Sequence, residues 1–293
     1  MSTEKIPQIA FNPKKNKVLG VEIISIENLM SRNQKTDHSP EKAHVLKFNM
    51  IVLFTGGESE QLVDFVWHKV SKNTVIYLTR GQVNAFKFNK NLKGYLILFT
   101  NKYLEKQLNA LPQTTTIRLL TSHLFSPKIE IPKDLFIKKY FHLFYKEFYK
   151  ANETHIDTST IHHLFVILFN KLERLKTNQL PQIKNTERFS IFLKFKELLE
   201  SEYAKNRNAD YYAKELHITY KHLNIICKEV VHATAKQFID DFIILQAKRA
   251  LINSTDRSSN IAYAMGFEEP TNFIKYFKKR TGYTPNAFKK IHS

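Results

Sequence analysis

The sequence is poor in cysteine and in long apolar runs. It has one cysteine, Cys227, so no disulfide can form within the chain, and this fits a reducing compartment. Apolar runs such as residues 164–169 are far too short to span a bilayer. The first residues carry no apolar core of a secretion signal. We therefore expect a soluble cytoplasmic protein with no membrane partner.

Motifs of catalysis are also missing. The 293 residues contain no glycine-rich phosphate loop, no Ser–His–Asp signature and no His-Glu-X-X-His pattern, and Gly56-Gly57 alone indicates a turn. The strands hold no His-X-His pair. His44, His68 and His123 are scattered, so we interpret them as structural histidines rather than metal ligands. We expect no enzyme, no catalytic residue, no bound metal and no cofactor.

Apolar and basic residues are plentiful. Hydrophobic content is 43%, with 23 Phe and 13 Tyr, which is enough for a sizeable core and two domains. A net charge of +18 favours a polyanionic partner. The charge does not locate that partner, because residues 1–185 carry +12 and residues 186–293 only +6. A general abundance of Lys, Asn, Ile and Phe explains the charge equally well, so a motif has to support any nucleic-acid function.

The first half of the chain has a β pattern. Short β-branched and aromatic segments, separated by Gly and Asn at roughly ten-residue spacing, predict a sandwich or barrel. A turn is expected at Arg80-Gly81-Gln82. The expected strands are Val18–Ile26, His44–Phe54 as one strand or two, Gln61–Val66, Thr74–Leu78, Asn84–Phe88 and Lys93–Phe99.

A helical period begins after the β pattern. We expect helices at Asn101–Asn109, from Leu135 to Phe148, and from Ile161 to Leu175 after a cap at residues 157–159. The last two form a hairpin within residues 131–180. Its apolar stripe is equally suited to the chain's own core and to a second copy, and we expect a dimer seam there. Residues 181–186 are polar and contain Pro181, which indicates a linker.

Residues 208–230 follow a helix–turn–helix pattern. Asn208 is suited to cap a first helix around the small Ala213, and Thr219 caps a second. Leu223, Ile226, Cys227 and Val230 share one face of that second helix and should be buried. A short second helix projecting from such a platform fits the DNA major groove. The candidate DNA contacts are Thr219, Lys221, His222, Asn224 and Lys228, with Asn224 suited to adenine.

Residues 258–280 repeat the pattern. Ala262 lies at the centre of the first helix, Gly266 suits its left-handed end, and Phe267 should turn back into the core. We expect a second helix capped by Thr271, with Phe273 and Phe277 buried, and ended by residues 281–285, which include Gly282 and Pro285. Candidate base contacts are Thr271, Asn272, Ile274 and Lys275, and candidate phosphate contacts are Lys278, Lys279 and Arg280.

A helix at Phe238–Leu251 joins the two units. At ~1.5 Å per residue it spans roughly 20 Å, and with its flanking helices it can hold the units near the ~34 Å separation of successive major-groove faces. Lys248 and Arg249 at its end, and Arg257 beyond it, are candidate phosphate contacts.

The ordered run of Ala262, Gly266, Phe267, Phe273, Phe277, Gly282 and Pro285 resembles the C-terminal signature of the AraC/XylS family of transcriptional regulators. The resemblance covers residues 187–290 and implies a DNA-binding domain at 187–293. It implies a sequence-specific dimer on double-stranded promoter DNA that influences RNA polymerase. Many members carry a basic residue where Ile225 stands, an arginine at Ile243 and a buried aliphatic residue at Ser258.

Residues 44–104 more loosely resemble the family's cupin-like sensor, through Asp64-Phe65, Arg80–Val83 and Lys93–Phe99. This implies an α+β protein whose residues 1–130 form a cupin-like β-barrel that holds a small effector. Asn84 stands where a histidine is more usual. Two alternatives stay open: a cupin-type metal enzyme with a helical appendage, and a constitutive DNA-binding regulator whose barrel is filled by its own side chains. The sequence does not distinguish an activator from a repressor.

Overall fold

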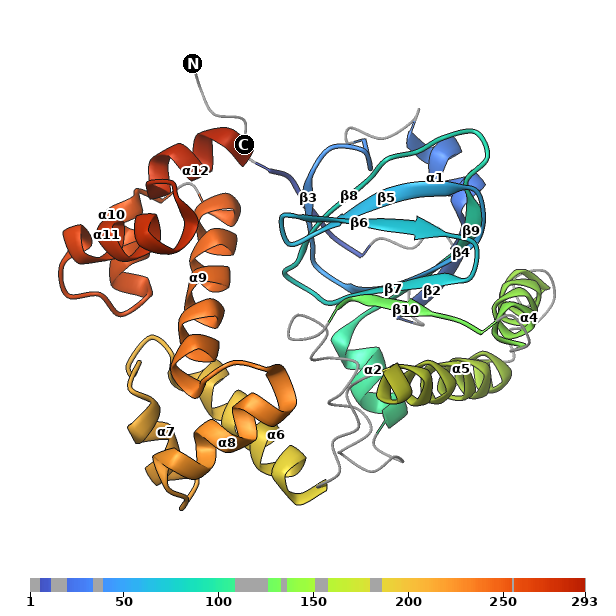
Figure 1. Ribbon diagram of the computed structural model, residues 1–293. Coiled ribbons are helices and arrows are strands. Elements are labelled where there is room, and N and C mark those ends of the chain that lie inside the picture. Colours follow the sequence, from blue (N-terminus) through green and yellow to red (C-terminus); the bar gives the residue numbers. More distant parts are fainter. Residues whose placement is uncertain are drawn as a thin grey trace. The chain divides into compact units, whose positions relative to one another are not determined.

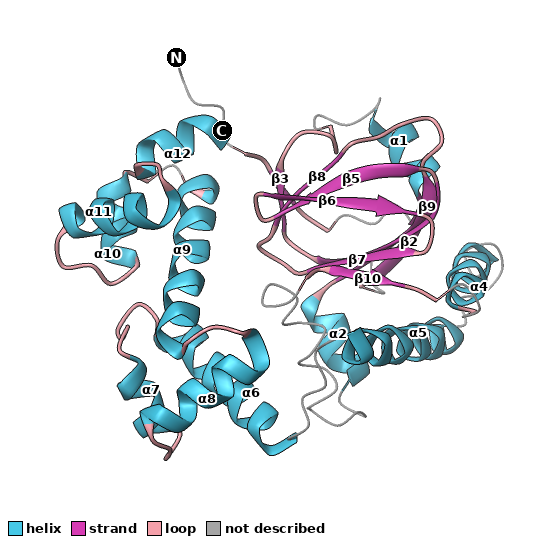
Figure 2. Ribbon diagram, viewed as in Figure 1, coloured by secondary structure: helices cyan, strands magenta, loops and turns pink. Residues whose placement is uncertain are grey.

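The computed structural model describes residues 6–11, 20–33, 39–108, 126–132, 136–150, 158–179, 186–254 and 256–292. The protein is an α+β molecule with two compact units, one made by Pro7–Leu180 and the other by Pro181–Ser293 (Figure 1). Strands dominate the first unit and helices make up the second (Figure 2). No helix among the described residues is long and apolar enough to cross a membrane.

The N-terminal unit contains two five-stranded sheets, in the orders β1-β3-β8-β5-β6 and β10-β7-β4-β9-β2. Within the described residues only β1 and β3 pair in parallel. The strands are β1 Gln8–Ile9, β2 Val21–Ser25, β3 His44–Leu46, β4 Asn49–Gly56, β5 Glu58–Val63, β6 Val66–Ser71, β7 Thr74–Leu78, β8 Val83–Phe86, β9 Lys93–Phe99 and β10 Lys128–Glu130. Closure would require the edge strands to pair with one another. The described edges do not, so the expected barrel is corrected to a two-sheet β domain.

Both faces of the second sheet are buried, which explains the unbroken apolar run of β4. Met50, Val52 and Phe54 face the first sheet and share a core with its residues Leu46 and Phe86. The alternate residues of β4 point to the opposite face, where helices cover them. A strand covered on both sides has no solvent face to mark with polar residues. Residues His44–Phe54, for which either one strand or two was expected, form the two strands β3 and β4.

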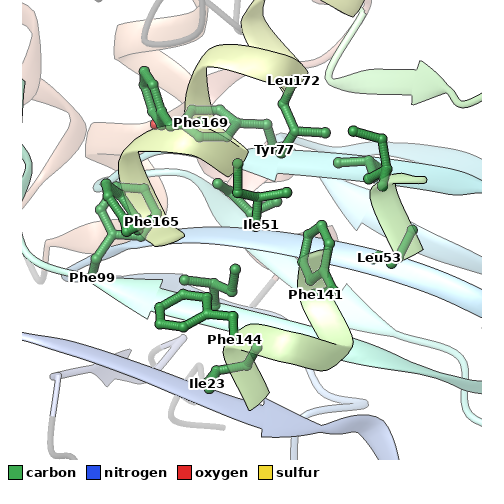
Figure 3. Packing of buried hydrophobic residues seen from close by; sticks show 14 of the residues in the cluster. Ile23, Ile51, Leu53, Tyr77, Phe99, Phe141, Phe144, Phe165, Phe169 and Leu172 are labelled. Atoms are coloured by element: carbon green, nitrogen blue, oxygen red, sulfur yellow. The ribbon is translucent and has the colours of Figure 1, made fainter. Parts of the chain in front are cut away.

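Helices α4 (Ile137–Lys150) and α5 (Thr158–Gln179) cover the outer face of the second sheet. Figure 3 shows Phe141, Phe144, Phe165 and Phe169 packed over Ile51. The expected apolar stripe of α5 is thus buried against its own sheet. A dimer contact through these helices therefore has to use their outer faces.

Two tyrosine–histidine pairs connect the hairpin to the rest of this unit. Tyr95 Oη on β9 lies 3.0 Å from His142 Nδ1 on α4. Tyr103 Oη on α2 (Asn101–Leu108) lies 2.9 Å from His162 Nδ1 on α5. Burial, reinforced by the charge of Lys106, lowers the pKa of His162. His162 is therefore a structural histidine that the fold favours in its neutral form.

A row of buried polar side chains crosses the first sheet on its inner face. Asn84 on β8 donates from Nδ2 to His44 Nε2 at 3.1 Å, and its Oδ1 accepts from Gln61 Nε2 at 2.8 Å. His44 Nδ1 in turn lies 3.0 Å from the carbonyl oxygen of Lys42. Gln61 Oε1 has no hydrogen-bond partner within the described residues. His44 is therefore structural, as expected, while His123 lies outside the described residues.

Two of the three segments that carry the weaker sensor resemblance, Asp64-Phe65 and Arg80–Val83, are in contact. Gln82 donates from Nε2 to Asp64 Oδ2 at 2.6 Å, and Asp64 Oδ1 accepts from the amide N–H of Val83 at 3.2 Å. Asp64 and Phe65 both have positive φ, at 46° and 72°, so they form the turn between β5 and β6. The strand expected at Gln61–Val66 is corrected to this hairpin. The helix α1 (Ile26–Asn33) follows β2 directly and was missed, as were β6 and β10.

The C-terminal unit consists of seven helices in the described residues: α6 Thr186–Glu202, α7 Ala209–Glu215, α8 Tyr220–Val231, α9 Ala235–Asn253, α10 Ser258–Ala264, α11 Pro270–Thr281 and α12 Pro285–His292. Phe195 of α6 joins the first part of this core, because its ring lies 5.5 Å from Tyr212 of α7 and 5.7 Å from Phe238 of α9. Figure 1 shows α9 running from this group of helices to the group formed by α10, α11 and α12. The predicted linker at residues 181–186 lies outside the described residues, apart from Thr186 at the start of α6.

Candidate nucleic-acid interface

The first helix–turn–helix unit is formed by α7 and α8. Asn208 Oδ1 caps α7 by accepting from the amide N–H of Asp210 at 3.0 Å. Thr219 Oγ1 caps α8 by accepting from the amide N–H of His222 at 3.1 Å. Ala213 is buried at the contact between the helices, and His217 supplies the left-handed residue of the turn. Both predicted caps are confirmed.

Helix α8 has one buried face and one exposed face. Leu223, Ile226, Cys227 and Val230 are all buried, as predicted. Burial raises the pKa of the Cys227 thiol to about 12, so this thiol is a packing group and not a nucleophile. Lys221 and Lys228 are exposed on the other side, and Ile225 between them is 42% exposed.

Asn224 does not point freely outward. It is half-buried, and its Oδ1 accepts from the backbone N–H of Ala235 at 2.9 Å. That N–H belongs to the first turn of α9 and has no partner within its own helix. Asn224 therefore ties the first recognition helix to the connecting helix, which corrects its expected exposed orientation. His222 is also half-buried.

The connecting helix α9 extends further at both ends than the predicted Phe238–Leu251. Thr234 and Gln237 form a capping box at its N-terminus, so the helix begins at Ala235. Its 19 residues span about 28 Å. Lys248 and Arg249 are half-buried near its end, and Lys248 Nζ lies 5.6 Å from the centre of the Phe288 ring.

The second unit is formed by α10 and α11. Ala262 is fully buried in α10, and Phe267 turns inward, with its ring 5.2 Å from that of Phe273. Helix α11 begins at Pro270, whose fixed φ and missing N–H suit the first helical position. Thr271 therefore lies inside the first turn, and its expected role as the cap is wrong. Glu269 holds the cap position without a side-chain hydrogen bond.

The outer face of α11 carries most of the predicted contacts. Phe273 and Phe277 are buried, as predicted, and Phe277 packs on Phe288 of α12 at 5.5 Å between ring centres. Gly282 ends the helix with φ of 80°, and Pro285 begins α12. The exposed residues are Thr271, Asn272, Ile274, Lys275, Lys278, Lys279 and Arg280, with Ile274 at 36%.

The recognition helices present the same four outward positions. Their buried residues correspond at an offset of fifty, with Leu223 matching Phe273 and Cys227 matching Phe277. Their C-terminal caps, His232 and Gly282, match at the same offset and are both left-handed. The pairs on the side away from these buried residues are Lys221 with Thr271, Asn224 with Ile274, Ile225 with Lys275 and Lys228 with Lys278, and of these eight residues Asn224 alone is half-buried. We call these eight positions the reading face.

The turn before α11 is seated on the segment after α6. An added Cβ on Gly266 would lie 1.6 Å from the carbonyl oxygen of Ala204, so only glycine fits this contact. Arg207 donates to the carbonyl oxygens of Met265, at 3.2 Å, and Gly266. Its guanidinium also lies 3.4 Å from the centre of the Phe267 ring. Arg207 was not among the predicted residues, although its place just before the Asn208 cap was the available signal.

A buried carboxylate fixes α11 on α9. Asp240 is 5% exposed, and it accepts from Tyr276 Oη at 2.9 Å and pairs with Lys236 at 2.7 Å and with Arg280. Burial, reinforced by Asp240, raises the pKa of Tyr276, so the phenol stays a neutral donor. Arg280, an expected phosphate contact, is exposed and forms an ion pair with Asp240. The sequence does not distinguish the buried Asp240 from the exposed Asp241 that follows it, so this contact could not be predicted.

The geometry offers chemistry suited to polyanion recognition. Lysine side chains on the reading face can meet phosphates, while short polar side chains on the first turn of α11 can reach base edges. No group of three or more His, Cys, Asp or Glu residues able to hold a metal ion occurs in the part of the chain that the structure describes.

Three comparisons bear on this unit. Residues 212–291 match a family model described as a helix-turn-helix domain. A segment of 78 residues is 32% identical to the uncharacterized HTH-type transcriptional regulator YisR of Bacillus subtilis, and it covers 27% of each chain. A segment of 95 residues is 32% identical to an uncharacterized HTH-type transcriptional regulator in the cgkA 5' region of Pseudoalteromonas carrageenovora, covering 32% of this chain and 56% of that relative. The matches thus span about a quarter and about half of these relatives.

Among solved structures, ToxT from Vibrio cholerae aligns over 93% of this chain and 97% of its own, with 11% identity and a TM-score of 0.48.

Proposed function

Because residues 212–291 form a helix-turn-helix domain of the AraC type, we propose that this chain is a sequence-specific DNA-binding transcriptional regulator. It inserts α8 and α11 into successive major grooves on one side of the duplex. The observation that carries the proposal is the shared reading face, in which each of two helices buries an apolar side and turns lysines, polar side chains and one isoleucine away from it.

The contacts divide by chemistry. Exposed lysines at positions 221, 228, 275, 278 and 279 are proposed to meet phosphates, which sets affinity and register. Thr271 and Asn272 lie exposed in the first turn of α11 and are proposed to reach base edges. Thr219 and His222 occupy the corresponding turn of α8. Lys248 and Arg249 are half-buried, so we propose for them at most phosphate contact.

The test is selection of bound duplexes from a random pool with the full-length protein, followed by binding measurements at several salt concentrations. We expect an enriched sequence that binds about 10³-fold or more tightly than random duplex near 0.15 M salt. Lys228→Ala should weaken specific and random duplexes alike and reduce the salt slope, whereas Asn272→Ala should weaken mainly the selected sequence. A pool with no enriched sequence would refute the proposal.

We also propose that the N-terminal unit receives a small effector. The buried row of His44, Asn84 and Gln61, with Gln61 Oε1 unpaired, supports a polar ligand or a water-mediated one. The test is a thermal-shift screen of small polar compounds on the full chain, with Gln61→Leu as the variant that should lose the response. A folded protein that responds to nothing and regulates constitutively would contradict this part.

A homodimer is proposed through the outer faces of α4 and α5. These faces carry exposed apolar side chains, with Leu143 44% and Ile167 41% exposed. Light scattering during size-exclusion chromatography should give twice the chain mass, and Leu143→Asp with Ile167→Asp should return it to the chain mass. Paired sites on a promoter would let such a dimer alter the access or recruitment of RNA polymerase.

A further inference from the structure

Each recognition helix exposes one isoleucine in the middle of its reading face. Ile225 is 42% exposed on α8 and Ile274 is 36% exposed on α11. The other aliphatic and phenylalanine side chains within the two helices are buried or half-buried. Burial of a large apolar side chain is favourable, so an exposed one gains nothing from folding. When it lies on a proposed binding face, it marks a place where the partner can bury it.

The neighbours of both isoleucines are groups suited to DNA. Ile225 is flanked on its own face by Lys221, four residues before it, and Lys228, three residues after it. Ile274 is flanked by Thr271, three residues before it, and Lys278, four residues after it. If Lys221 and Lys228 meet phosphates on the groove walls, Ile225 between them faces the floor of the groove, and Ile274 does so if Lys278 meets a phosphate while Thr271 reaches a base edge.

An isoleucine has no hydrogen-bonding group and cannot read donors or acceptors on base edges. The major-groove edges of the four base pairs carry one apolar group, the C5-methyl of thymine. The two isoleucines are also offset, because Ile225 corresponds to Lys275 and Ile274 corresponds to Asn224. The two helices therefore present their apolar group at different points along the groove.

We propose that Ile225 and Ile274 are specificity-determining residues, each of which packs against a thymine methyl in the groove segment read by its helix. The inference rests on the proposed function, because it specifies which bases that function selects. At one position in each half of the site, the protein should prefer thymine to cytosine because of the apolar contact with the thymine methyl group and not because of a hydrogen bond.

Replacing a thymine by deoxyuridine removes this methyl and leaves base pairing and every hydrogen-bonding group in place. Burial of one such group contributes about 0.8 kcal/mol, so the loss of one methyl should weaken binding about fourfold. We expect two positions in the selected site, one in each half, at which this replacement weakens the full-length protein by that factor. Replacement of other thymines should have no effect.

Variants assign each position to its residue. In the half of the site read by α8, Ile225→Ala should bind the thymine and deoxyuridine duplexes equally. In the half read by α11, it should still bind the deoxyuridine duplex about fourfold more weakly. Ile274→Ala should show the reverse, and Ile225→Val should keep part of the penalty. Ile291→Ala is the matched control, because Ile291 is 56% exposed on α12, outside the reading face. This control should keep both penalties.

The outcomes separate the two proposals. A selection that enriches no sequence refutes the proposed function, and this inference with it. A selected site at which every deoxyuridine replacement is silent overturns the inference and leaves the function standing. Penalties that persist unchanged in Ile225→Ala and Ile274→Ala also overturn it, because the methyl groups would then contact other residues.

Discussion

Gly266 is the position at which the smallest substitution should have the largest effect. It has φ of 77°, and its missing side chain makes room for the carbonyl oxygen of Ala204. Gly282 has nearly the same φ, 80°, with nothing within 4 Å of the place a Cβ would take. Gly266→Ala and Gly282→Ala therefore share the cost of a left-handed alanine and differ only in the close contact.

The left-handed conformation costs an alanine roughly 1–2 kcal/mol. In Gly266→Ala the new Cβ would also start 1.6 Å from the Ala204 oxygen, so the turn has to move by more than an ångström. That movement breaks the hydrogen bonds from Arg207 to the carbonyl oxygens of Met265 and Gly266, which contribute about 1.5–3 kcal/mol when one partner is charged. We expect a total of about 2.5–5 kcal/mol for Gly266→Ala and about 1–2 kcal/mol for Gly282→Ala.

Hydrogen–deuterium exchange of the full-length protein, followed by mass spectrometry, measures this locally. Peptides from α10 and α11 should exchange on the order of 10²-fold faster or more in Gly266→Ala. The same peptides should exchange only about tenfold faster in Gly282→Ala, and peptides from the β strands should not change in either variant. Equal acceleration in the two glycine variants would refute the reasoning, because the close contact between Gly266 and Ala204 would then contribute nothing to stability.

Four further changes test other contacts. Asp240→Ala should accelerate exchange in α11 by an amount equivalent to about 3 kcal/mol, since it removes the buried carboxylate to which both Arg280 and Tyr276 donate, whereas Asp241→Ala, whose side chain is 71% exposed, should have little effect. Lys176→Met should raise the free energy of unfolding at pH 7 by about 2 kcal/mol in chemical denaturation, because burial lowers the pKa of Lys176 to about 8 and, among the described residues, the hydrogen bond lost is the one to the Ser126 carbonyl; an unchanged stability would contradict this. The pKa of His162 is lowered in the fold, so its contribution is complete above the unfolded pKa of about 6.5 and is lost as pH falls below it; His162→Gln should flatten the melting temperature between pH 7.5 and 5, and an unchanged slope would count against it. Asn224→Ala should weaken selected and random duplexes about equally, because its Oδ1 is used by Ala235, and a loss confined to the selected sequence would restore a base contact.

The sequence predicted most of the local structure in the C-terminal unit. Asn208 and Thr219 cap their helices as expected, and the apolar spacing of α8 identified its buried face. The caps and the buried face depend on residues only a few positions apart in the sequence. They can therefore be predicted from the local sequence pattern. The predicted cap of α11, Thr271, lies two residues after the observed one, Glu269, because Pro270 between them begins the helix.

Contacts between distant residues were not predictable in the same way. Arg207 meets the carbonyl oxygen of Met265, which is 58 residues away, and Tyr276 meets Asp240 across 36 residues. The outward role given to Asn224 failed for this reason, since its partner belongs to the next helix. In the N-terminal unit, the turn at Asp64-Phe65 has positive φ at two residues that do not usually adopt it, and the sequence therefore placed a strand across it.

The contact between Gly266 and the segment after α6 decides where a DNA-binding fragment can be cut from the chain. The family match begins at residue 212, yet Ala204 and Arg207, which support the turn before α11, lie upstream of that point. A fragment cut at residue 212 would retain both recognition helices and lose the residues against which the second one is held. A minimal DNA-binding fragment should therefore start before Thr186, so that it contains the whole of α6 and the segment that follows it.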